Sequence, residues 1–391
     1  MKNDYLQTPY FLIHEDLLAE NIDGFRHAMD KIWPNSIIAY SVKTNSLPWI
    51  LNWMNKHGVY AEVVSDEEYQ LALLSGYVPN KIVFNGPIKT DDYLYKAFAD
   101  GSIVNIDSKH ELEYIKKAKP EINGTLGVRI NVDPSIFDPE DVGYQEDGFR
   151  FGFCSENGAL KKTLDTLFSI YGNIHIGLHL HVNSITRSLN VYRAIASYAA
   201  GIIREHGIDP SYIDIGGGFF GGVPGKTTPE EYISAIKKEL EEVVDVSNTT
   251  LIIEPGSAAI GSSIELHTSV IDVKDTLHGR IVTTDGSRIH IDPLWLKKGY
   301  MYTTDSTREP HKRQVICGYT CMDHDRLMVI ENMPELYVGD HITYQRVGNY
   351  TVTFGGPFIR PYPPVYCQIG DKIEKVRKQM SMEDYYRMET E

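Results

Sequence analysis

The sequence predicts an α/β protein in which a (β/α)8 TIM barrel is followed by a smaller, β-rich domain. Eight short apolar segments lie between residues 37 and 254, and segments of helical length separate them. After Glu254 the helical periodicity fades, and segments with alternating or β-branched residues take its place. The 391 residues are enough for both parts, since a barrel of this kind takes ~250 residues.

The expected barrel elements alternate between strand and helix along the chain. The strands are expected at Ile37–Val42, Val59–Ala61, Ile82–Phe84, Ile103–Ile106, Leu126–Val128, Ile174–Leu180, Tyr212–Ile215 and Leu251–Ile253. The helices are expected at Leu47–Lys56, Asp66–Ser75, Asp92–Asp100, Ser108–Lys117, Ala159–Ser169, Asn190–Glu205 and Pro229–Val243.

We therefore divide the chain into three segments: residues 1–30, a barrel at 31–262, and a β-rich domain at 263–391. The first segment holds a strand at Tyr10–Ile13 and a helix from about Glu15 to Asp30. We expect that strand to join the β-rich sheet, because both barrel ends would then connect to one domain. Further strands are expected at Thr268–Val273, Arg280–Thr284, Gln314–Ile316, His341–Arg346 and Thr351–Phe354, and a loosely packed helix end after Gln379.

Composition and charge exclude several classes of protein. The formal net charge of −15 disfavours nucleic acid and anionic membrane surfaces as partners. The polar start Met1–Tyr5 lacks the apolar stretch of a signal peptide, and no apolar run approaches ~18 residues. The cysteines are too sparse for a disulfide framework: Cys154, Cys317, Cys321 and Cys367. We expect a cytoplasmic protein.

Nearly every expected strand runs directly into a polar residue suited to chemistry. These residues are Lys43, Glu62 with Ser65, Asn85, Asp107, Arg129, His181, the run Gly216-Gly217-Gly218, and Glu254. Barrel enzymes place their active sites at the C-terminal ends of the strands. A lysine, a histidine, a triple glycine and a carboxylate at that rim indicate a phosphorylated, carbonyl-bearing cofactor. Pyridoxal 5'-phosphate (PLP) has that chemistry.

Each residue also has a simpler interpretation. Desolvation would lower the pKa of Lys43, as a Schiff-base lysine requires, although an exposed lysine is the commoner case. The glycines let backbone N–H groups converge on a phosphate, but they also suit a flexible hairpin or hinge. Glu254 could keep a pyridine nitrogen protonated, or it could accept hydrogen bonds from backbone amides at the barrel mouth.

Two histidine- or cysteine-containing motifs raise the question of a metal. His179 and His181 share a strand face, so they could bind a metal, or one ring could stack on a flat cofactor while Ser184 meets its phosphate. Cys317, Cys321 and His324 could form part of a zinc site, but a single reactive thiol in a loop is the simpler interpretation. We expect no metal.

Nine motifs occur in an order that resembles a known family. They are Tyr-Ser-Val-Lys43-Thr-Asn, Glu62…Ser65…Glu68, Phe84-Asn-Gly-Pro-Ile-Lys89, Arg150-Phe-Gly152, His-Leu-His181-Val-Asn-Ser184, Asp-Ile-Gly216-Gly-Gly218, Glu254-Pro-Gly256, Thr320-Cys321…Asp325 and Gly348-Asn-Tyr350-Thr. Over roughly residues 8–370 the chain resembles the fold-type III PLP-dependent decarboxylases, the ornithine, diaminopimelate and arginine decarboxylase family.

The resemblance implies an alanine-racemase-like barrel and a role for each motif. Lys43 would carry the Schiff base, His181 would stack on the pyridine ring, and Glu254 would pair with the ring nitrogen. The phosphate would be held by Ser184, Gly216, Gly217, Gly218 and Tyr350, while Glu62, Arg129 and Gly256 would complete the cofactor site. The family's active site lies at a homodimer interface, so Cys321 would come from the partner subunit and reprotonate the carbanion.

The chain departs from the family pattern in three respects, at four positions. Ser257 replaces the arginine after Glu-Pro-Gly, and Met322 replaces the acidic residue after the catalytic cysteine. Asp292 and Leu296 occupy the places of an arginine and a tyrosine of diaminopimelate enzymes. With Cys321, Met322, Asp325 and Asp292 expected to face the substrate, these changes imply decarboxylation of an atypical amino acid or amino-acid conjugate. A PLP-dependent racemase and a non-catalytic regulatory homologue are the alternatives.

Overall fold

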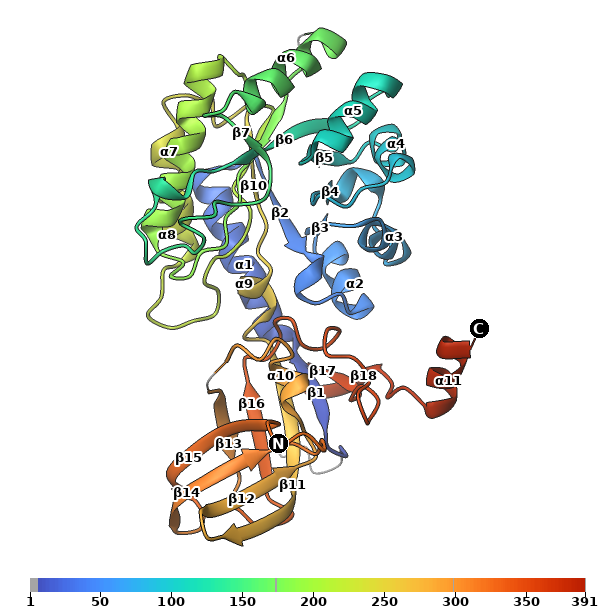
Figure 1. Cartoon of the computed structure of the whole chain (residues 1–391), viewed down its shortest axis with the longest axis vertical. Coiled ribbons are helices and arrows are strands. Elements are labelled where there is room, and N and C mark those ends of the chain that lie inside the picture. Colours follow the sequence, from blue (N-terminus) through green and yellow to red (C-terminus); the bar gives the residue numbers. More distant parts are fainter. Residues whose placement is uncertain (1–5, 173, 298, 391) are drawn as a thin grey trace. The chain divides into compact units, whose positions relative to one another are not determined.

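The computed structural model describes residues 6–172, 174–297 and 299–390, which fall into two compact units (Figure 1). One unit comprises Asn21–Ala259. The other combines Met1–Glu20 with Ile260–Glu391. The polar start Met1–Tyr5 lies outside the described residues. Among the helices that are described, none combines the length and the apolar character needed to cross a membrane.

The unit Asn21–Ala259 is a closed barrel of parallel strands, which confirms the predicted fold. The strands are β2 (Ser36–Ser41), β3 (Tyr60–Val63), β4 (Ile82–Phe84), β5 (Ile103–Ile106), β6 (Thr125–Asn131), β8 (Gly177–His179), β9 (Tyr212–Asp214) and β10 (Thr250–Ile253), with β7 (Phe153–Cys154) beside β6. Their order is β5-β4-β3-β2-β10-β9-β8-β6, and the pairing of β5 with β6 closes the ring.

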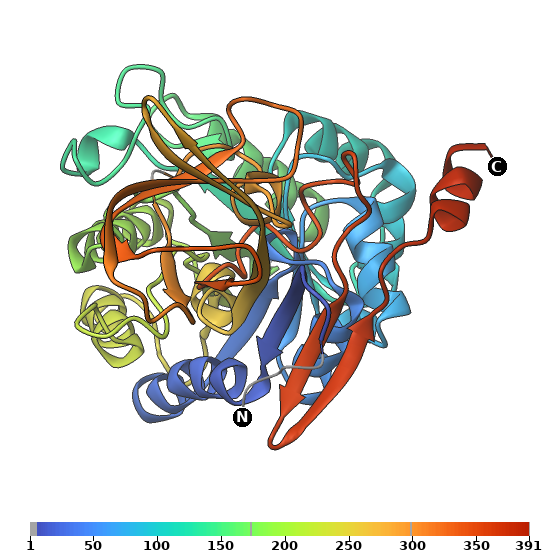
Figure 2. The same cartoon turned by 90° about the horizontal axis from the view of Figure 1, so that it is seen from below.

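Helices surround these strands, and those that were predicted differ from their expected bounds by only a few residues (Figure 2). They are α1 (Glu15–Ile32), α2 (Pro48–Lys56), α3 (Asp66–Leu74), α4 (Asp91–Ala99), α5 (Lys109–Ala118), α6 (Ala159–Tyr171), α7 (Leu189–His206) and α8 (Pro229–Leu240). The short α9 (Ser257–Ile260) was not predicted. Local chemistry sets their starts. Ser108 caps α5 and Thr228 caps α8, each in a reciprocal capping box with a glutamate three residues on.

The barrel interior is apolar at one level and polar at the next. Ala39, Val83, Tyr212 and Ile252 form a buried cluster. Side chains two residues apart on a strand share a face, so the next inward positions are Ser41, Asn85, Asp214 and Glu254. Tyr212 has room because Gly127 and Gly177 face it, where a Cβ would lie 2.0 Å from its ring or hydroxyl. The apolar layer thus lies beneath a polar layer.

The second unit is a mixed sheet in which β1 (Tyr10–His14) is an internal strand. The sheet runs β15-β14-β12-β11-β1-β17-β18, and β16 pairs with β11 and β13. Its other strands are β11 (Ile264–Thr276), β12 (Gly279–Thr284), β13 (Met301–Thr304), β14 (Pro310–Cys317), β15 (Arg326–Pro334), β16 (His341–Gln345), β17 (Val365–Ile369) and β18 (Lys372–Arg377). β1 is antiparallel to β11 and parallel to β17.

One expected strand of this unit is wrong. Thr351–Phe354 forms a turn, in which the Phe354 amide donates to the Thr351 carbonyl at 3.1 Å. Tyr350 before it adopts φ 51°, a left-handed conformation that ends an extended segment. The expectation of few helices after Glu254 is met by the short α10 (Arg288–Ile291) and by α11 (Met382–Thr390), which has no buried residue.

Candidate active site

Lys43 and Glu62 form an ion pair at the end of strands β2 and β3. Lys43 sits in a single 3-10 turn, Val42–Thr44, and its Nζ lies 2.9 Å from Oε2 of Glu62. Burial alone would raise the pKa of Glu62, but the Lys43 ammonium and hydrogen bonds from Ser41, Lys43 and Asn85 lower it. The lysine side chain is 40% exposed, whereas that of Glu62 is 1% exposed. The amine is therefore paired yet accessible.

His181 presents an uncharged ring at the end of β8. Burial, followed by the positive charges of Arg129 and Lys43, lowers the pKa of His181 to about 3. Its Nδ1 accepts a hydrogen bond from the Gly217 amide at 3.3 Å. A Cβ on Gly216, which has φ 69°, would lie 2.4 Å from that Nδ1. The ring orientation therefore depends on glycine at 216.

The glycine run after β9 is held tightly by its neighbours. The Glu254 amide donates to the Gly216 carbonyl at 2.8 Å, and the Tyr192 hydroxyl donates to the Gly217 carbonyl at 3.1 Å. A Cβ on Gly217 would lie 2.2 Å from the Glu254 carbonyl oxygen. Such a rigid, side-chain-free turn suits a phosphate group and does not suit a flexible hinge.

Glu254 lies in a buried group with His179 and Asp214. One ring nitrogen of His179 and one carboxylate oxygen of each acid lie within 4.8 Å of one another. Burial, followed by the negative charges of Asp214 and Glu62, raises the pKa of Glu254 well above its usual value. Burial also raises the pKa of Asp214 to about 7, and lowers that of His179 well below its usual value.

Asn85 connects the two glutamates. Its amide nitrogen donates to Oε1 of Glu62 at 3.1 Å and to Oε1 of Glu254. The Asn85 oxygen accepts from Asn105 at 2.8 Å, and Asn105 accepts from the Tyr212 hydroxyl at 2.6 Å. This chain fixes which way the Asn85 amide points.

Arg129 is positioned by Asp107 on the neighbouring strand. Its NH1 lies 3.1 Å from Oδ2 of Asp107, and its NH2 donates to the His181 carbonyl at 3.4 Å. The other Asp107 oxygen accepts from the Gly152 amide at 2.9 Å. The guanidinium stacks over Phe151 at 4.4 Å. Arg129 therefore joins the Phe151 loop to the His181 loop.

Two further expected residues of the barrel unit have local partners. The Ser184 hydroxyl accepts from the Arg187 amide at 2.8 Å and donates to the Asp141 carbonyl at 3.4 Å. A Cβ on Gly256 would lie 2.1 Å from Oγ1 of Thr44, so glycine is needed beside the Lys43 turn. Ser257, which stands where the family has arginine, begins α9.

The β-rich unit carries Cys321, Met322, Asp325 and Tyr350. Cys321 is an exposed free thiol in the turn that follows β14, and Tyr350 is exposed. Asp325 is buried: its Oδ2 accepts from Ser287 and Thr320, and its Oδ1 accepts from the Arg288 amide at 2.9 Å. Both Asp325 oxygens thus hold the cysteine loop in shape.

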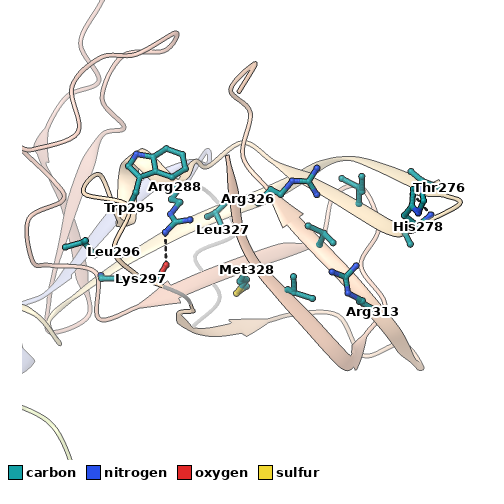
Figure 3. Close-up of a pocket in the computed structure, with 14 residues that line it drawn as sticks. Thr276, His278, Arg288, Trp295, Leu296, Lys297, Arg313, Arg326, Leu327 and Met328 are labelled. Carbon is teal, nitrogen blue, oxygen red and sulfur yellow. Dashed lines mark hydrogen bonds between the residues drawn. The ribbon is translucent and has the colours of Figure 1, made fainter. Parts of the chain in front are cut away.

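Asp292 is also engaged within the protein. Its Oδ2 accepts from Arg288 Nε at 3.0 Å and NH2 at 2.8 Å, and its Oδ1 accepts from the Leu296 amide at 3.0 Å. Arg288 lines a groove of about 610 Å³ over β12, β14 and β15, and it also donates to the Lys297 carbonyl (Figure 3). The Asp292 carboxylate is therefore neutralised by Arg288.

The structure gives roles to residues for which the sequence predicted none: Ser41, Asn85, Asp107, Asp214 and Arg288. Asn85 and Asp107 were among the polar residues expected at strand ends. Ser41 and Asp214 lie at strand ends on the same face as predicted residues, so the same signal could have found them. Across the described part of the chain, His, Cys, Asp and Glu side chains converge compactly only at His179, Asp214 and Glu254. Cys317, Cys321 and His324 do not form such a group.

Comparison with known proteins agrees with this geometry. Residues 18–261 match the family model described as the pyridoxal binding domain of pyridoxal-dependent decarboxylases. A probable chloroplastic diaminopimelate decarboxylase from Oryza sativa is 28% identical over 397 residues, covering 97% of this chain and 79% of the relative.

Two solved structures show the same architecture. A Helicobacter pylori diaminopimelate decarboxylase mutant in complex with L-lysine has a TM-score of 0.82 at 25% identity, covering 99% of this chain and 98% of that one. The Paramecium bursaria Chlorella virus arginine decarboxylase has a TM-score of 0.77 at 23% identity, covering 94% and 97%. Relatives with two different named substrates thus share this fold.

Proposed function

Because the chain belongs to the pyridoxal-dependent decarboxylase family and is a PLP-dependent carboxy-lyase of an amino acid, we propose that its substrate carries no charged group at the end of its side chain. The observation that carries the site assignment is the accessible Lys43–Glu62 pair at the barrel rim, with the glycine run and Glu254 on the adjoining strands. The substrate assignment is carried by Met322.

The rim residues fit the cofactor by the chemistry that each one offers. Lys43 would hold its aldehyde carbon, and the Gly216–Gly218 turn, with Ser184, would hold its phosphate. His181 offers an uncharged flat ring for stacking, and Glu254 offers a carboxyl group to the pyridine nitrogen. Bound PLP supplies an electron sink for the electrons left when the carboxylate departs as CO2.

The remaining rim residues position these groups. Glu62 holds the Lys43 amine at the strand end, and Asn85 holds Glu62 and Glu254 at a constant separation. Arg129 fixes the His181 loop through the carbonyl of that residue. The apolar layer of Ala39, Val83, Tyr212 and Ile252 packs the barrel interior beneath these residues.

We infer that Cys321 returns a proton to the substrate carbon after CO2 leaves, and that it does so in a homodimer. A thiol in an exposed turn can reach a substrate bound in another subunit, and an S–H group can donate a proton. Closed two-fold dimers are the commonest arrangement of soluble oligomers. The net charge of −15 and the free state of all four cysteines fit a cytoplasmic enzyme.

The substrate proposal depends on four positions at which a charge is missing or already neutralised. Met322 cannot pair with an ammonium group as a carboxylate would. Asp325 and Asp292, the other acidic residues expected at the substrate, are engaged by the cysteine loop and by Arg288. Ser257 likewise provides no cation for a distal carboxylate. A buried substrate charge without a partner is unfavourable by several kcal/mol, so a neutral or conjugated side chain fits better.

Two experiments test the proposal in sequence. Reduction with borohydride followed by peptide mass spectrometry is expected to find the cofactor on Lys43, and Lys43→Ala is expected to lose both that label and turnover by orders of magnitude. The cofactor label on another lysine would refute the site. CO2 release is then measured with a panel of free and conjugated amino acids, and loss of optical rotation without CO2 release would identify a racemase.

Two variants, Met322→Glu and Asp323→Asn, show which of these two neighbouring positions can bind a distal ammonium group. We expect Met322→Glu to improve kcat/KM for ornithine, lysine or meso-diaminopimelate, because it adds the missing carboxylate. Efficient turnover of these compounds by the wild type, near ~10⁴ M⁻¹s⁻¹ or above, would contradict the proposal. If Asp323→Asn then abolished that turnover, the exposed Asp323 would be the residue that binds the ammonium.

A further inference from the structure

The buried group beneath the cofactor site contains one carboxyl group more than the cofactor needs. Glu254 faces the expected position of the ring nitrogen, whereas Asp214 has no counterpart in the assigned roles. Asp214 is fully buried at the end of β9, and its Oδ1 accepts from the Gly216 amide at 2.9 Å. Its Oδ2 meets no N–H or hydroxyl donor, and the side chain that it faces is the Glu254 carboxyl group. Two buried carboxyl groups can form a hydrogen bond only when one of them carries a proton.

The two carboxyl groups cannot both be ionised at low cost while they are this close. One carboxylate oxygen of each acid and one ring nitrogen of His179 lie within 4.8 Å of one another, and all three side chains are buried. Two carboxylates that share a desolvated site keep at least one proton between them at neutral pH. Burial raises the pKa of both groups, and the charges of Asp214 and Glu62 raise that of Glu254 further.

The charged groups around the pair do not remove that proton. Lys43 and Arg129 are the nearby cations, but Lys43 pairs with Glu62, and Arg129 pairs with Asp107. His179 is neutral, and its Nε2 lies 3.9 Å from Oε2 of Glu254. His181 is neutral as well and accepts from Gly217. Asn85, the one hydrogen-bond donor to Glu254 among the described side chains, is uncharged.

We propose that Asp214 keeps Glu254 protonated until the cofactor binds, so that the proton on the pyridine nitrogen comes from Glu254 and not from solvent. The O–H bond of Glu254 breaks and an N–H bond forms, which leaves a carboxylate next to a pyridinium. The total charge of the group is unchanged by this transfer. Asp214 is thus a positioning residue that acts through Glu254. This inference rests on the proposed role of Glu254.

Asp214→Asn tests the proposal with little change of shape. The asparagine oxygen can still accept from the Gly216 amide, while the negative charge beside Glu254 is removed. Glu254 then ionises at a lower pH, and the pyridine nitrogen must take its proton from solvent. Calorimetry of PLP binding to the cofactor-stripped chain, in buffers of different ionisation enthalpy, counts the protons exchanged. At pH 8 we expect Asp214→Asn to take up more protons than the wild type, by up to about one.

Asp165→Asn on α6 is the matched control. It makes the same change of side chain at an exposed carboxylate, which pairs with Lys161 and lies outside the group at the barrel rim. Its proton count should equal that of the wild type. His179→Gln should also leave the count unchanged, because a neutral histidine holds no exchangeable charge. If His179→Gln changes the count and Asp214→Asn does not, the proposal is overturned.

A second measurement does not depend on binding. Infrared spectra of the cofactor-stripped chain should contain a carboxylic-acid C=O band that is absent in Glu254→Gln. As the pH rises, this band should disappear at a lower pH in Asp214→Asn than in the wild type. If the pH midpoint of this band is the same in Asp214→Asn and in the wild type while PLP still binds normally, this inference is refuted and the proposed role of Glu254 is unaffected. If Glu254→Gln left PLP affinity and spectrum unchanged, the proposed role of Glu254 would fail instead. A stoichiometric divalent metal lost in Asp214→Asn would also overturn the inference, because it would hold both carboxyl groups ionised.

Discussion

Glu62 and Glu254 accept hydrogen bonds from the same amide group, that of Asn85, yet their environments drive their protonation in opposite directions. The pKa of Glu62 is lowered by Lys43 and its hydrogen-bond donors despite burial, whereas burial and neighbouring negative charge raise the pKa of Glu254. Pairs of carboxyl groups separated in this way are typical of acid–base sites. One barrel rim thus holds an anion for the lysine and an acid for the cofactor ring.

Replacement of Glu62 by glutamine should move the pH dependence of cofactor attachment. The variant keeps the hydrogen bonds from Ser41 but loses the charge that stabilises the Lys43 ammonium. The neutral amine, which is the nucleophile, should then be available at lower pH. Absorbance after mixing with PLP across the pH range measures the midpoint. Glu67→Gln, an exposed change on α3, is the control, and an identical midpoint in Glu62→Gln and wild type would contradict the assigned pairing.

A mixture of Lys43→Ala and Cys321→Ala subunits should regain activity that neither variant has alone. In a two-fold dimer with shared sites, each mixed dimer contains one intact site, and random mixing yields about a quarter of wild-type activity. Subunits are exchanged between the two variant dimers, and the mixed dimers are quantified by native mass spectrometry. The activity of the mixture is then assayed. Mixed dimers that form but remain inactive would show that Lys43 and Cys321 act within one subunit.

Gly217→Ala should destabilise the barrel and weaken PLP binding together. The added Cβ would lie 2.2 Å from the Glu254 carbonyl oxygen, so the strand end must move, at a cost of about 1–3 kcal/mol. Gly201→Ala on α7 is the control because a Cβ there meets nothing within 4 Å. Denaturant unfolding and PLP titration measure both effects. Equal stability and affinity in the two variants would show that the glycine run is not closely packed.

The β-rich unit should show a histidine-dependent loss of stability at alkaline pH. His14 lies 3.1 Å from Glu265, and this hydrogen bond and charge raise the pKa of His14 despite partial burial. The His14–Glu265 pair therefore contributes its full stabilisation below the unfolded-state histidine pKa of ~6.5. That stabilisation is lost as the pH rises through the pKa of His14 in the folded protein. The difference in Tm between wild type and His14→Gln should shrink from pH 6 to pH 9. The exposed His278→Gln should show no such change, and a constant difference for His14→Gln would disprove the pairing.

The barrel and its rim were predictable because each strand is short, apolar and followed at once by a polar residue. Lys43, His181, the glycine run and Glu254 could be found this way. Asn85 and Asp214 stood in the same sequence motifs, but their importance depends on the inward face that they share across strands. That register is a property of the closed sheet and is not visible along a single strand.

The β-rich unit was less predictable for local reasons. Lys372–Arg377 forms β18 although four of its six residues are charged, because the strand lies at the exposed edge of the sheet. Thr351–Phe354 has the β-branched composition of a strand, but the left-handed Tyr350 turns the chain just before it. The engagement of Asp292 by Arg288 likewise depends on one turn of helix at α10, which is too short to recognise from periodicity.

The layer formed by Ala39, Val83, Tyr212 and Ile252 fills the barrel beneath its polar rim. Tyr212 occupies the space that Gly127 and Gly177 leave free. A packed barrel offers no passage along its axis, so whatever binds at the rim enters and leaves on the rim side. The chemistry of the rim therefore depends on a layer of side chains that takes no part in it.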